Sequence, residues 1–310
     1  MDSASIPAPS GFALVVAIAI GCLPARASAD AFWTTWGDGK AELGGYRLTQ
    51  PRYGAARTGS AVLIFVTEDF SDSLRVKADP GKHPASDVFP VMKLNLVRRF
   101  QTGIYDYSVL SSTFVRIDAT SGEEAFGLVK ASLSVQEWCG HVYQQWLRRG
   151  VHLIGVSHSY FDGEADTSPV LVIPYGAVFE DAIPILVRGL RGAWLTPGEQ
   201  REVPFLASGV SARFTHKPQA FSRARISRGK QPERFEPTGR KLDVDVYTVE
   251  EIGGATTRYF VEPAGAQRLL GWTRSDGEKA TLIDTARLPY WELNHEGEEA
   301  ALAKLGLRPR

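Results

Sequence analysis

Apolar residues along this chain recur in short runs and at every second position, which is the spacing of β-strands. Residues 61–66 (AVLIFV) are rich in β-branched and aromatic side chains and too few for a helix, so they predict a strand covered on both faces. Residues 92–96 alternate between apolar and polar side chains, which predicts a strand with one buried face. Residues 109–117 are again β-branched and aromatic.

Two glycine-containing turns give the strongest hairpin signals. Gly253-Gly254 separates two strand-like runs within residues 242–261, and Asp276-Gly277 separates two more within residues 269–284. Such turns join neighbouring antiparallel strands. The C-terminal third is therefore expected to be an antiparallel meander.

Helix signals are few. An amphipathic segment covers residues 178–190, where Pro184 has to lie near a helix N-terminus or break the helix. A second candidate covers residues 296–305, with Asn294 as its N-cap and Gly306 directly after its C-terminus.

The fold class that these patterns favour is mainly β, a curved antiparallel sheet or an open barrel or meander with one or two short helices. Residues 30–195 form an N-terminal β-rich block and residues 196–310 a C-terminal meander with a terminal helix, packed together as one globular unit. Loops are expected at 79–90 and 195–204, both rich in proline or glycine. No glycine-rich phosphate loop follows a strand, so we expect no nucleotide cofactor, and no other cofactor is indicated.

Composition narrows the class of protein further. The 310 residues are 44% hydrophobic, with 35 basic and 35 acidic side chains, which excludes intrinsic disorder and a polytopic membrane protein. Zero formal charge argues against nucleic acid as a partner.

The N-terminus has the pattern of an export signal. Residues 11–23 carry no charge, Pro24 follows, and Ala27-Ser28-Ala29 is an A-x-A site, so residues 1–29 are interpreted as a signal peptide. The alternative is a lipid anchor at Cys22, since residues 19–22 (AIGC) are similar to a bacterial lipobox. Both interpretations predict an exported protein of the periplasm or outer-membrane periphery.

One segment carries candidate chemistry. If residues 133–147 form one unbulged strand, Glu137, Cys139 and His141 share a face. A two-residue turn at Arg149-Gly150 would then place three further side chains opposite them, in the pairs His141 with His158, Cys139 with Tyr160, and Glu137 with Asp162.

Three interpretations of this cluster stay open at this point. It can be a polar lining within the sheet, because free cysteine is usually buried. It can be a zinc or copper site formed by Cys139, His141 and His158 with Asp162 or Glu137. It can also be a nucleophilic site in which His141 or His158 deprotonates Cys139, because the thiolate is the attacking species.

The same region resembles a known group of sequences. The segments SVQEWCGHVYQQ (134–145), KLNLVRRFQTGIYDYS (93–108), SYFDGEAD (159–166) and LPYWELN (288–294) resemble an uncharacterised bacterial exported family labelled "septum formation inhibitor Maf". True Maf proteins are cytoplasmic nucleotide pyrophosphatases with a Ser-x-Arg-Arg-type motif near the N-terminus, which this chain lacks. The resemblance therefore implies an exported envelope protein, and it implies neither division-inhibitor activity nor catalytic residues.

Residues 213–241 are strongly basic, with nine basic and two acidic side chains and interleaved phenylalanines. This composition is typical of contact with an anionic surface, such as lipid head groups. An edge strand protected by charge explains Arg223 and Arg225 equally well. The residues expected to make the anionic contact are Arg213, Lys217, Arg223, Arg225, Arg228 and Lys230.

The leading functional hypothesis is a non-enzymatic envelope protein whose β scaffold binds an apolar or amphiphilic ligand, a lipid, or an envelope protein partner through its concave face. The aromatic residues expected to contact that ligand alternate with polar ones around the hairpin, and they are Trp138, Tyr143, Trp146 and Tyr160. The alternatives are a hydrolase or thiol enzyme that depends on Cys139 and a histidine, and a metal-binding protein that uses the same residues.

Overall fold

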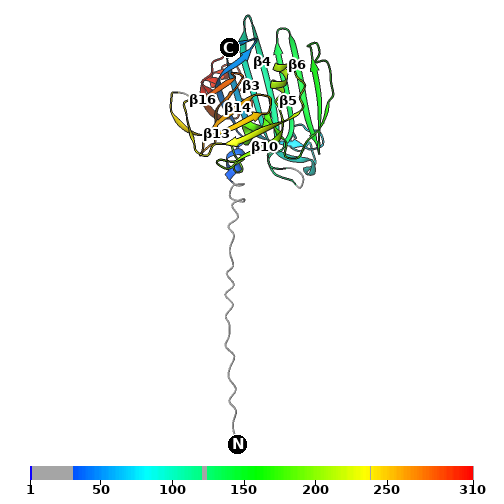
Figure 1. Ribbon diagram of the computed structural model, residues 1–310, viewed down its shortest axis with the longest axis vertical. Coiled ribbons are helices and arrows are strands. Elements are labelled where there is room, and N and C mark those ends of the chain that lie inside the picture. Colours follow the sequence, from blue (N-terminus) through cyan, green and yellow to red (C-terminus); the bar gives the residue numbers. More distant parts are fainter. Residues whose placement is uncertain (2–30, 121–123, 238, 310) are drawn as a thin grey trace.

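A single sheet of 16 strands organises the computed structural model, which describes residues 1, 31–120, 124–237 and 239–309 (Figure 1). Residues 2–29 of the predicted export signal, which include Cys22, lie outside the described residues. The first half of the chain contributes β1 (Ala41–Arg52), β2 (Ala55–Ser71), β3 (Val88–Thr102), β4 (Tyr105–Arg116), β5 (Leu128–Glu137), β6 (Gly140–Arg149), β7 (His152–Ser159) and β8 (Val170–Val172). The second half contributes β9 (Val178–Phe179), β10 (Gln200–Leu206), β11 (Phe221–Arg228), β12 (Glu233–Phe235), β13 (Leu242–Glu251), β14 (Thr256–Val261), β15 (Leu269–Arg274) and β16 (Lys279–Leu288).

The strand order shows how the two blocks join. The strands from β8 to β1 lie side by side in reverse chain order, β16 pairs with β1, and the path continues through β15, β14, β13, β11 and β10 to β9. The β9–β10 pair is parallel and the others are antiparallel, as expected for a meander built from hairpins. The predicted fold class is confirmed, in its open-sheet form.

The hydrophobic patterns and glycine turns in the sequence explain where the strands form. Residues 61–66 lie within β2, where Leu63 and Phe65 are in the main core while Val62 and Ile64 pack against the C-terminal segment, so both faces are covered as predicted. Both predicted glycine hairpins form, between β13 and β14 and between β15 and β16. Gly253 and Gly277 have φ of 79° and 100°, a region that glycine enters without steric cost.

The helical segments are short. Within residues 178–190 the chain forms β9, a 3₁₀ turn η2 (Glu180–Ala182) and α2 (Ile183–Leu186), with Pro184 in the first turn of α2, where its missing N–H is tolerated. The others are a helical turn at residues 31–36, η1 (Ala85–Asp87), α3 (Gly209–Thr215), η3 (Tyr290–Glu292) and η4 (Glu298–Leu305).

Three predictions at element ends need correction. The expected loop at 79–90 ends early, because β3 begins at Val88 and includes Pro90. The N-cap of η4 is Gly297 and not Asn294, although Gly306 does follow the segment in the left-handed conformation, with φ of 66°. The expected loop at 195–204 ends early, because β10 begins at Gln200 and includes Pro204. Proline is tolerated there because β9 pairs only with Phe205 and Leu206, so β10 is an edge strand at Pro204.

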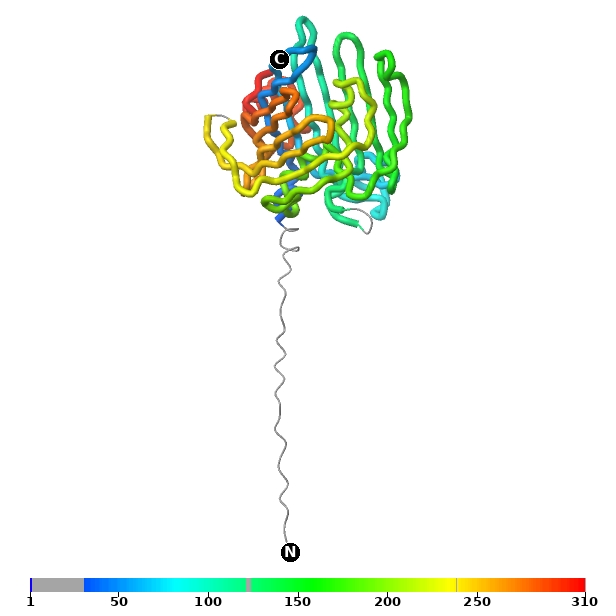
Figure 2. The backbone as a smooth tube through the Cα atoms, viewed as in Figure 1, coloured from blue at the N-terminus to red at the C-terminus, as the bar shows by residue number. Residues whose placement is uncertain are grey.

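The sheet curls so that its two halves enclose a shared interior (Figure 2). Side chains from β3 and β4 face side chains from β14 and β15 across a small cavity. The segment that contains η2, α2 and α3 fills the space between these halves, with η2 against β4 and α3 against β5. The concave face is therefore largely filled by the protein's own residues, and the remaining space is small.

Candidate functional site

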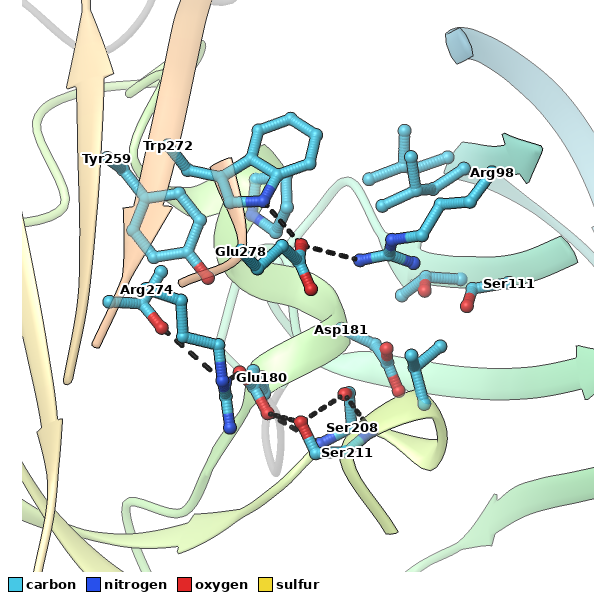
Figure 3. A pocket seen from close by; sticks show the side chains of 16 residues that line it. Arg98, Ser111, Glu180, Asp181, Ser208, Ser211, Tyr259, Trp272, Arg274 and Glu278 are labelled. Carbon is cyan, nitrogen blue, oxygen red and sulfur yellow. Dashed lines mark hydrogen bonds and ion pairs between the residues drawn. The ribbon is translucent and has the colours of Figure 1, made fainter. Parts of the chain in front are cut away.

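The cavity on the concave face combines apolar walls with charged groups from distant parts of the chain (Figure 3). Its volume is about 50 Å³, enough for a small polar group and far below the 300–1,000 Å³ of a typical drug-sized site. Its polar lining consists of Arg98, Ser111, Thr113, Glu180, Asp181, Ser208, Ser211, Thr257, Tyr259, Trp272, Arg274 and Glu278.

Glu180 fixes one side of this cavity. Its Oε1 accepts a hydrogen bond from Arg274 NH1 at 2.5 Å. Its Oε2 accepts bonds from the Ser208 backbone N–H at 2.7 Å and from Ser211 Oγ at 3.3 Å. Ser208 is the N-cap of α3, and its hydroxyl accepts the Ser211 backbone N–H at 3.1 Å. Glu180 therefore ties α3 to the opposite half of the sheet.

Glu278, in the turn between β15 and β16, holds the other side. Its Oε1 accepts the indole N–H of Trp272 at 2.7 Å, and its Oε2 accepts Gln50 Nε2 at 3.4 Å. Arg98 NH2 lies 3.6 Å from Glu278 Oε1, which is an ion pair without a short hydrogen bond. Glu278 is 7% exposed, so this cluster is shielded from solvent.

Two donors at the cavity are left without partners among the described residues. Arg98 Nε and Ser111 Oγ are buried and make no hydrogen bond there, in side chains whose residues are 9% and 5% exposed. Leu96 opposes Ser111 in the β3–β4 register, so Arg98 and Ser111 are diagonal neighbours on one face. Buried polar groups are almost always hydrogen-bonded, so these two atoms are unusual on the cavity wall, although other buried side chains of the described residues also have an atom without a partner.

Asp181 completes the constellation. Burial is the main cause that raises the pKa of its carboxyl to about 6, and the negative charge of Glu180 adds to the shift. The charge of Arg98 and a hydrogen bond from the Gly209 backbone N–H act in the opposite direction. Asp181 therefore exchanges its proton close to neutral pH and can donate or accept a hydrogen bond.

The hairpin predicted to carry the chemistry has a different register. The predicted single strand at 133–147 is wrong, because β5 ends at Glu137 and β6 begins at Gly140, with Trp138 and Cys139 in the turn between them. The next turn is formed by Gly150 and Val151, so Tyr143 opposes His158 and Val142 opposes Ser159. The expected pairs of His141 with His158, Cys139 with Tyr160, and Glu137 with Asp162 are therefore wrong.

The turn leaves Cys139 exposed. Its backbone N–H donates to Glu137 Oε2 at 2.8 Å, and hydrogen bonding to the Glu137 side chain raises the pKa of the thiol. A raised pKa leaves less thiolate at neutral pH, the opposite of what a nucleophilic cysteine requires.

The remaining polar candidates are dispersed. His141 and Asp162 are exposed, and His158 Nδ1 lies 3.2 Å from an oxygen of Asp166. Within residues 1, 31–120, 124–237 and 239–309, no group of three or more His, Cys, Asp or Glu side chains is arranged to hold a metal ion.

The four aromatic candidates also point to different environments. Trp138 and Tyr160 are exposed at the strand ends, and Tyr143 is exposed on β6. Trp146 is buried, and its indole N–H donates to Gln219 Oε1 at 2.7 Å. None of the four belongs to the lining of the cavity.

Much of the basic stretch is neutralised by neighbouring strands. Arg213 is buried against Glu164, and ion pairs join Arg223 to Glu202, Arg225 to Glu250 and Arg228 to Asp245. Lys217 and Lys230 are exposed. The edge-strand interpretation is wrong for β11, which lies between β10 and β13.

Sequence reasoning did not find Arg98, Ser111, Asp181 and Glu278. One signal was present, because Leu94, Leu96 and Arg98 occupy every second position of β3, so an arginine continues the buried face of the strand. A charged residue in that place requires a partner inside the fold.

Comparison of the chain with protein-family models, with curated proteins and with solved structures found no match. The part of the chain that the structure describes contains no helix long and apolar enough to span a membrane.

Proposed function

We propose that this chain is a non-enzymatic binding protein of the cell envelope, whose concave face binds a small organic acid through its carboxyl group. The observation that carries the proposal is the pair of unpartnered buried donors, Arg98 Nε and Ser111 Oγ, at one cavity with Asp181. The envelope location is supported by the signal-like residues 11–29.

The donor set suits a carboxylate. A guanidinium presents a planar fork that matches carboxylate geometry, and the Ser111 hydroxyl donates beside it. A protonated Asp181 donates a third bond, so that ligand and protein share one proton between two carboxyl groups. Leu94, Leu96 and Val210 line the same cavity and would contact the first carbons of the ligand.

The charges around Asp181 explain why the proton is needed. Glu180 on η2 is paired with Arg274 on β15, and Glu278 is paired with Arg98 on β3. The opposite charges within each pair cancel, so an ionised Asp181 gives the cavity one uncompensated negative charge. An incoming carboxylate would then meet repulsion, which protonation of Asp181 removes.

The test is a titration of the protein with propionate, and with propanol as the uncharged analogue, at pH 5.5 and pH 8, because the cavity has room only for a carboxyl group and a short chain. We expect propionate to bind at least tenfold more tightly at pH 5.5 and propanol to bind weakly at both. Arg98→Met and Ser111→Ala should each weaken propionate binding. Asp181→Asn should make propionate affinity nearly independent of pH.

Matched controls lie away from the cavity. Arg201 is exposed on β10, and Ser112 is half-buried on the opposite face of β4 from Ser111, so Arg201→Met and Ser112→Ala should leave propionate affinity unchanged. Equal propionate affinity in Arg98→Met and Arg201→Met, or tighter binding of propanol than propionate, would refute the proposal.

A further inference from the structure

A second and much larger recess lies on the outer face of the sheet. It is a groove of about 1,150 Å³ between the outer faces of β1–β3 and the C-terminal segment that follows β16. Its apolar walls come from Leu43, Val62, Ile64 and Val97 on the sheet and from Leu302 and Leu305 of η4. A volume of this size accommodates a long aliphatic chain, which the interior cavity cannot.

The C-terminal segment is held firmly against the sheet. A Cβ on Gly45 would lie 2.2 Å from the backbone oxygen of Leu305, so only glycine permits this approach. Leu305 is 2% exposed and packs with Ala41, Leu43 and Val66. The wall formed by η4 is therefore a built part of the fold.

One end of the groove is basic. In the strand register Ser60 opposes both Arg47 of β1 and Arg99 of β3, so the three residues form one row across the sheet. Neighbouring strands are about 4.8 Å apart, which places the two arginine Cα atoms about 10 Å apart with a hydroxyl between them. The next row toward the N-terminal end of β1 is apolar, with Val62 opposing Gly45 and Val97.

These two arginines are available for a ligand. Both are exposed, and within the part of the chain that the structure describes neither makes a hydrogen bond or ion pair. The groove also contains Glu298 and Glu299, whose carboxylates accept the backbone N–H groups of His295 and Gly297. The two glutamate carboxylates are thus hydrogen-bonded within their own turn, whereas the two arginine side chains have no hydrogen bond or ion pair among the described residues.

We infer that this groove binds a phosphate-headed amphiphile, with the phosphate between Arg47 and Arg99 beside Ser60 and the aliphatic chain along Val62, Val97 and Leu302. Two guanidinium groups with an intervening hydroxyl complement the charge and acceptor oxygens of a phosphate. The apolar row beside them distinguishes a lipid phosphate from free phosphate. This site lies on the opposite face of the sheet from the interior cavity, and the inference does not depend on the function proposed above.

The experiment compares three probes by calorimetric titration of the full exported chain: dodecyl phosphate below its micelle concentration, dodecanol and inorganic phosphate. We expect dodecyl phosphate to bind at least tenfold more tightly than either other probe. Shortening the chain should weaken binding by up to about fourfold per methylene removed. High salt should weaken it as well, because the arginines are exposed.

The variants separate this site from the rest of the molecule. Arg47→Ser combined with Arg99→Ser should reduce dodecyl phosphate affinity at least tenfold without loss of folded structure, because both side chains are exposed. The control with the same change in charge, Arg201→Ser combined with Lys217→Ser, removes exposed basic residues elsewhere and should have no effect. Arg98→Met should also leave this affinity unchanged.

Three results would overturn the inference. Binding of dodecanol as tightly as dodecyl phosphate would show that the arginines do not recognise the head group. Binding of inorganic phosphate as tightly as dodecyl phosphate would indicate a free-phosphate site without a role for the groove. Absence of binding, or equal loss in the test and control double variants, would exclude the site.

Discussion

The interior cavity and the turn between β5 and β6 each hold an acidic group whose pKa is raised, but the causes differ. Burial is the main cause for Asp181 at the cavity, where the pKa is about 6. Hydrogen bonding to the Glu137 side chain is the main cause for Cys139, which is exposed. One shift depends on the assembled interior of the protein, and the other depends on a single neighbouring side chain.

This difference distinguishes titratable groups whose pKa depends on tertiary packing from groups whose pKa depends on one neighbouring side chain. The cavity residues come from β3, β4, η2, β15 and the turn before β16, so each is positioned by tertiary packing. The turn residues are adjacent in sequence and positioned by one hairpin. Substitutions at the cavity should therefore change global stability, whereas substitutions at the turn should change local reactivity.

The largest expected effect is that of Glu278→Ala. The change leaves the guanidinium of Arg98, 9% exposed, without its carboxylate and deprives the Trp272 indole N–H of its acceptor. Removal of one partner of a buried ion pair costs about 3–5 kcal/mol. Urea unfolding should record a fall of that size in the free energy of unfolding.

Glu137→Ala, in the turn between β5 and β6, is the variant to compare with Glu278→Ala. It removes the acceptor for the Cys139 backbone N–H. Glu137 is half-buried at a strand end, and we expect a loss of about 0.5 kcal/mol, as for most surface substitutions. If the two variants lost equal stability, the charges at the cavity would be no more strongly coupled to the fold than the side chains of the turn.

The second effect concerns Asp181 and pH. Well below pH 3.8 its carboxyl is protonated in both the folded and the unfolded chain, so it does not change the free energy of unfolding. Between the ordinary pKa of 3.8 and the raised pKa of about 6, the unfolded chain releases the proton and the folded chain retains it. Stability is therefore lost progressively as pH rises through this window, and the loss is constant above it, at about 1–3 kcal/mol.

Asp181→Asn removes this pH dependence. The variant should come closest to the unmodified protein in stability at about pH 3 and exceed it by about 1–3 kcal/mol at pH 7. Urea unfolding from about pH 3 to about pH 8 measures the difference. A variant less stable than the unmodified protein at pH 7 would mean that the ionised Asp181 is well solvated or well paired.

The sequence predicts the fold well because strand patterns and glycine turns are local. The period-two alternation at 92–96 and the turns at Gly253-Gly254 and Asp276-Gly277 each need only a few neighbouring residues to specify them. The register at 133–159 failed for two reasons. The turn at Trp138-Cys139 contains neither proline nor glycine and so gave no signal, and the turn after β6 is formed by Gly150-Val151, one residue later than predicted. One missed turn reverses the face of the residues that follow.

The cavity could not be predicted for a different reason. Arg98 and Glu278 are far apart in the chain, and they meet only because the sheet curls until β3 faces β15. Curvature of this kind comes from the twist of the whole sheet and from the packing of η2, α2 and α3 inside it. A single sequence shows that Arg98 continues a buried face, but it does not show what the arginine meets there.

The smallest effect is a change in the reactivity of Cys139. Because Glu137 raises the pKa of the exposed thiol, alkylation by iodoacetamide should be slow at pH 7 and accelerate at alkaline pH. Glu137→Ala removes both the hydrogen-bond acceptor and the negative charge beside the thiol, so the alkylation rate at pH 8 should rise several-fold while urea unfolding changes little. Mass spectrometry of quenched samples gives the rate, and the urea-unfolded chain is the reference for an unperturbed thiol. Equal rates in the unmodified protein, the variant and the unfolded chain would show that Glu137 does not control the thiol, and the contrast with Asp181 would then rest on burial alone.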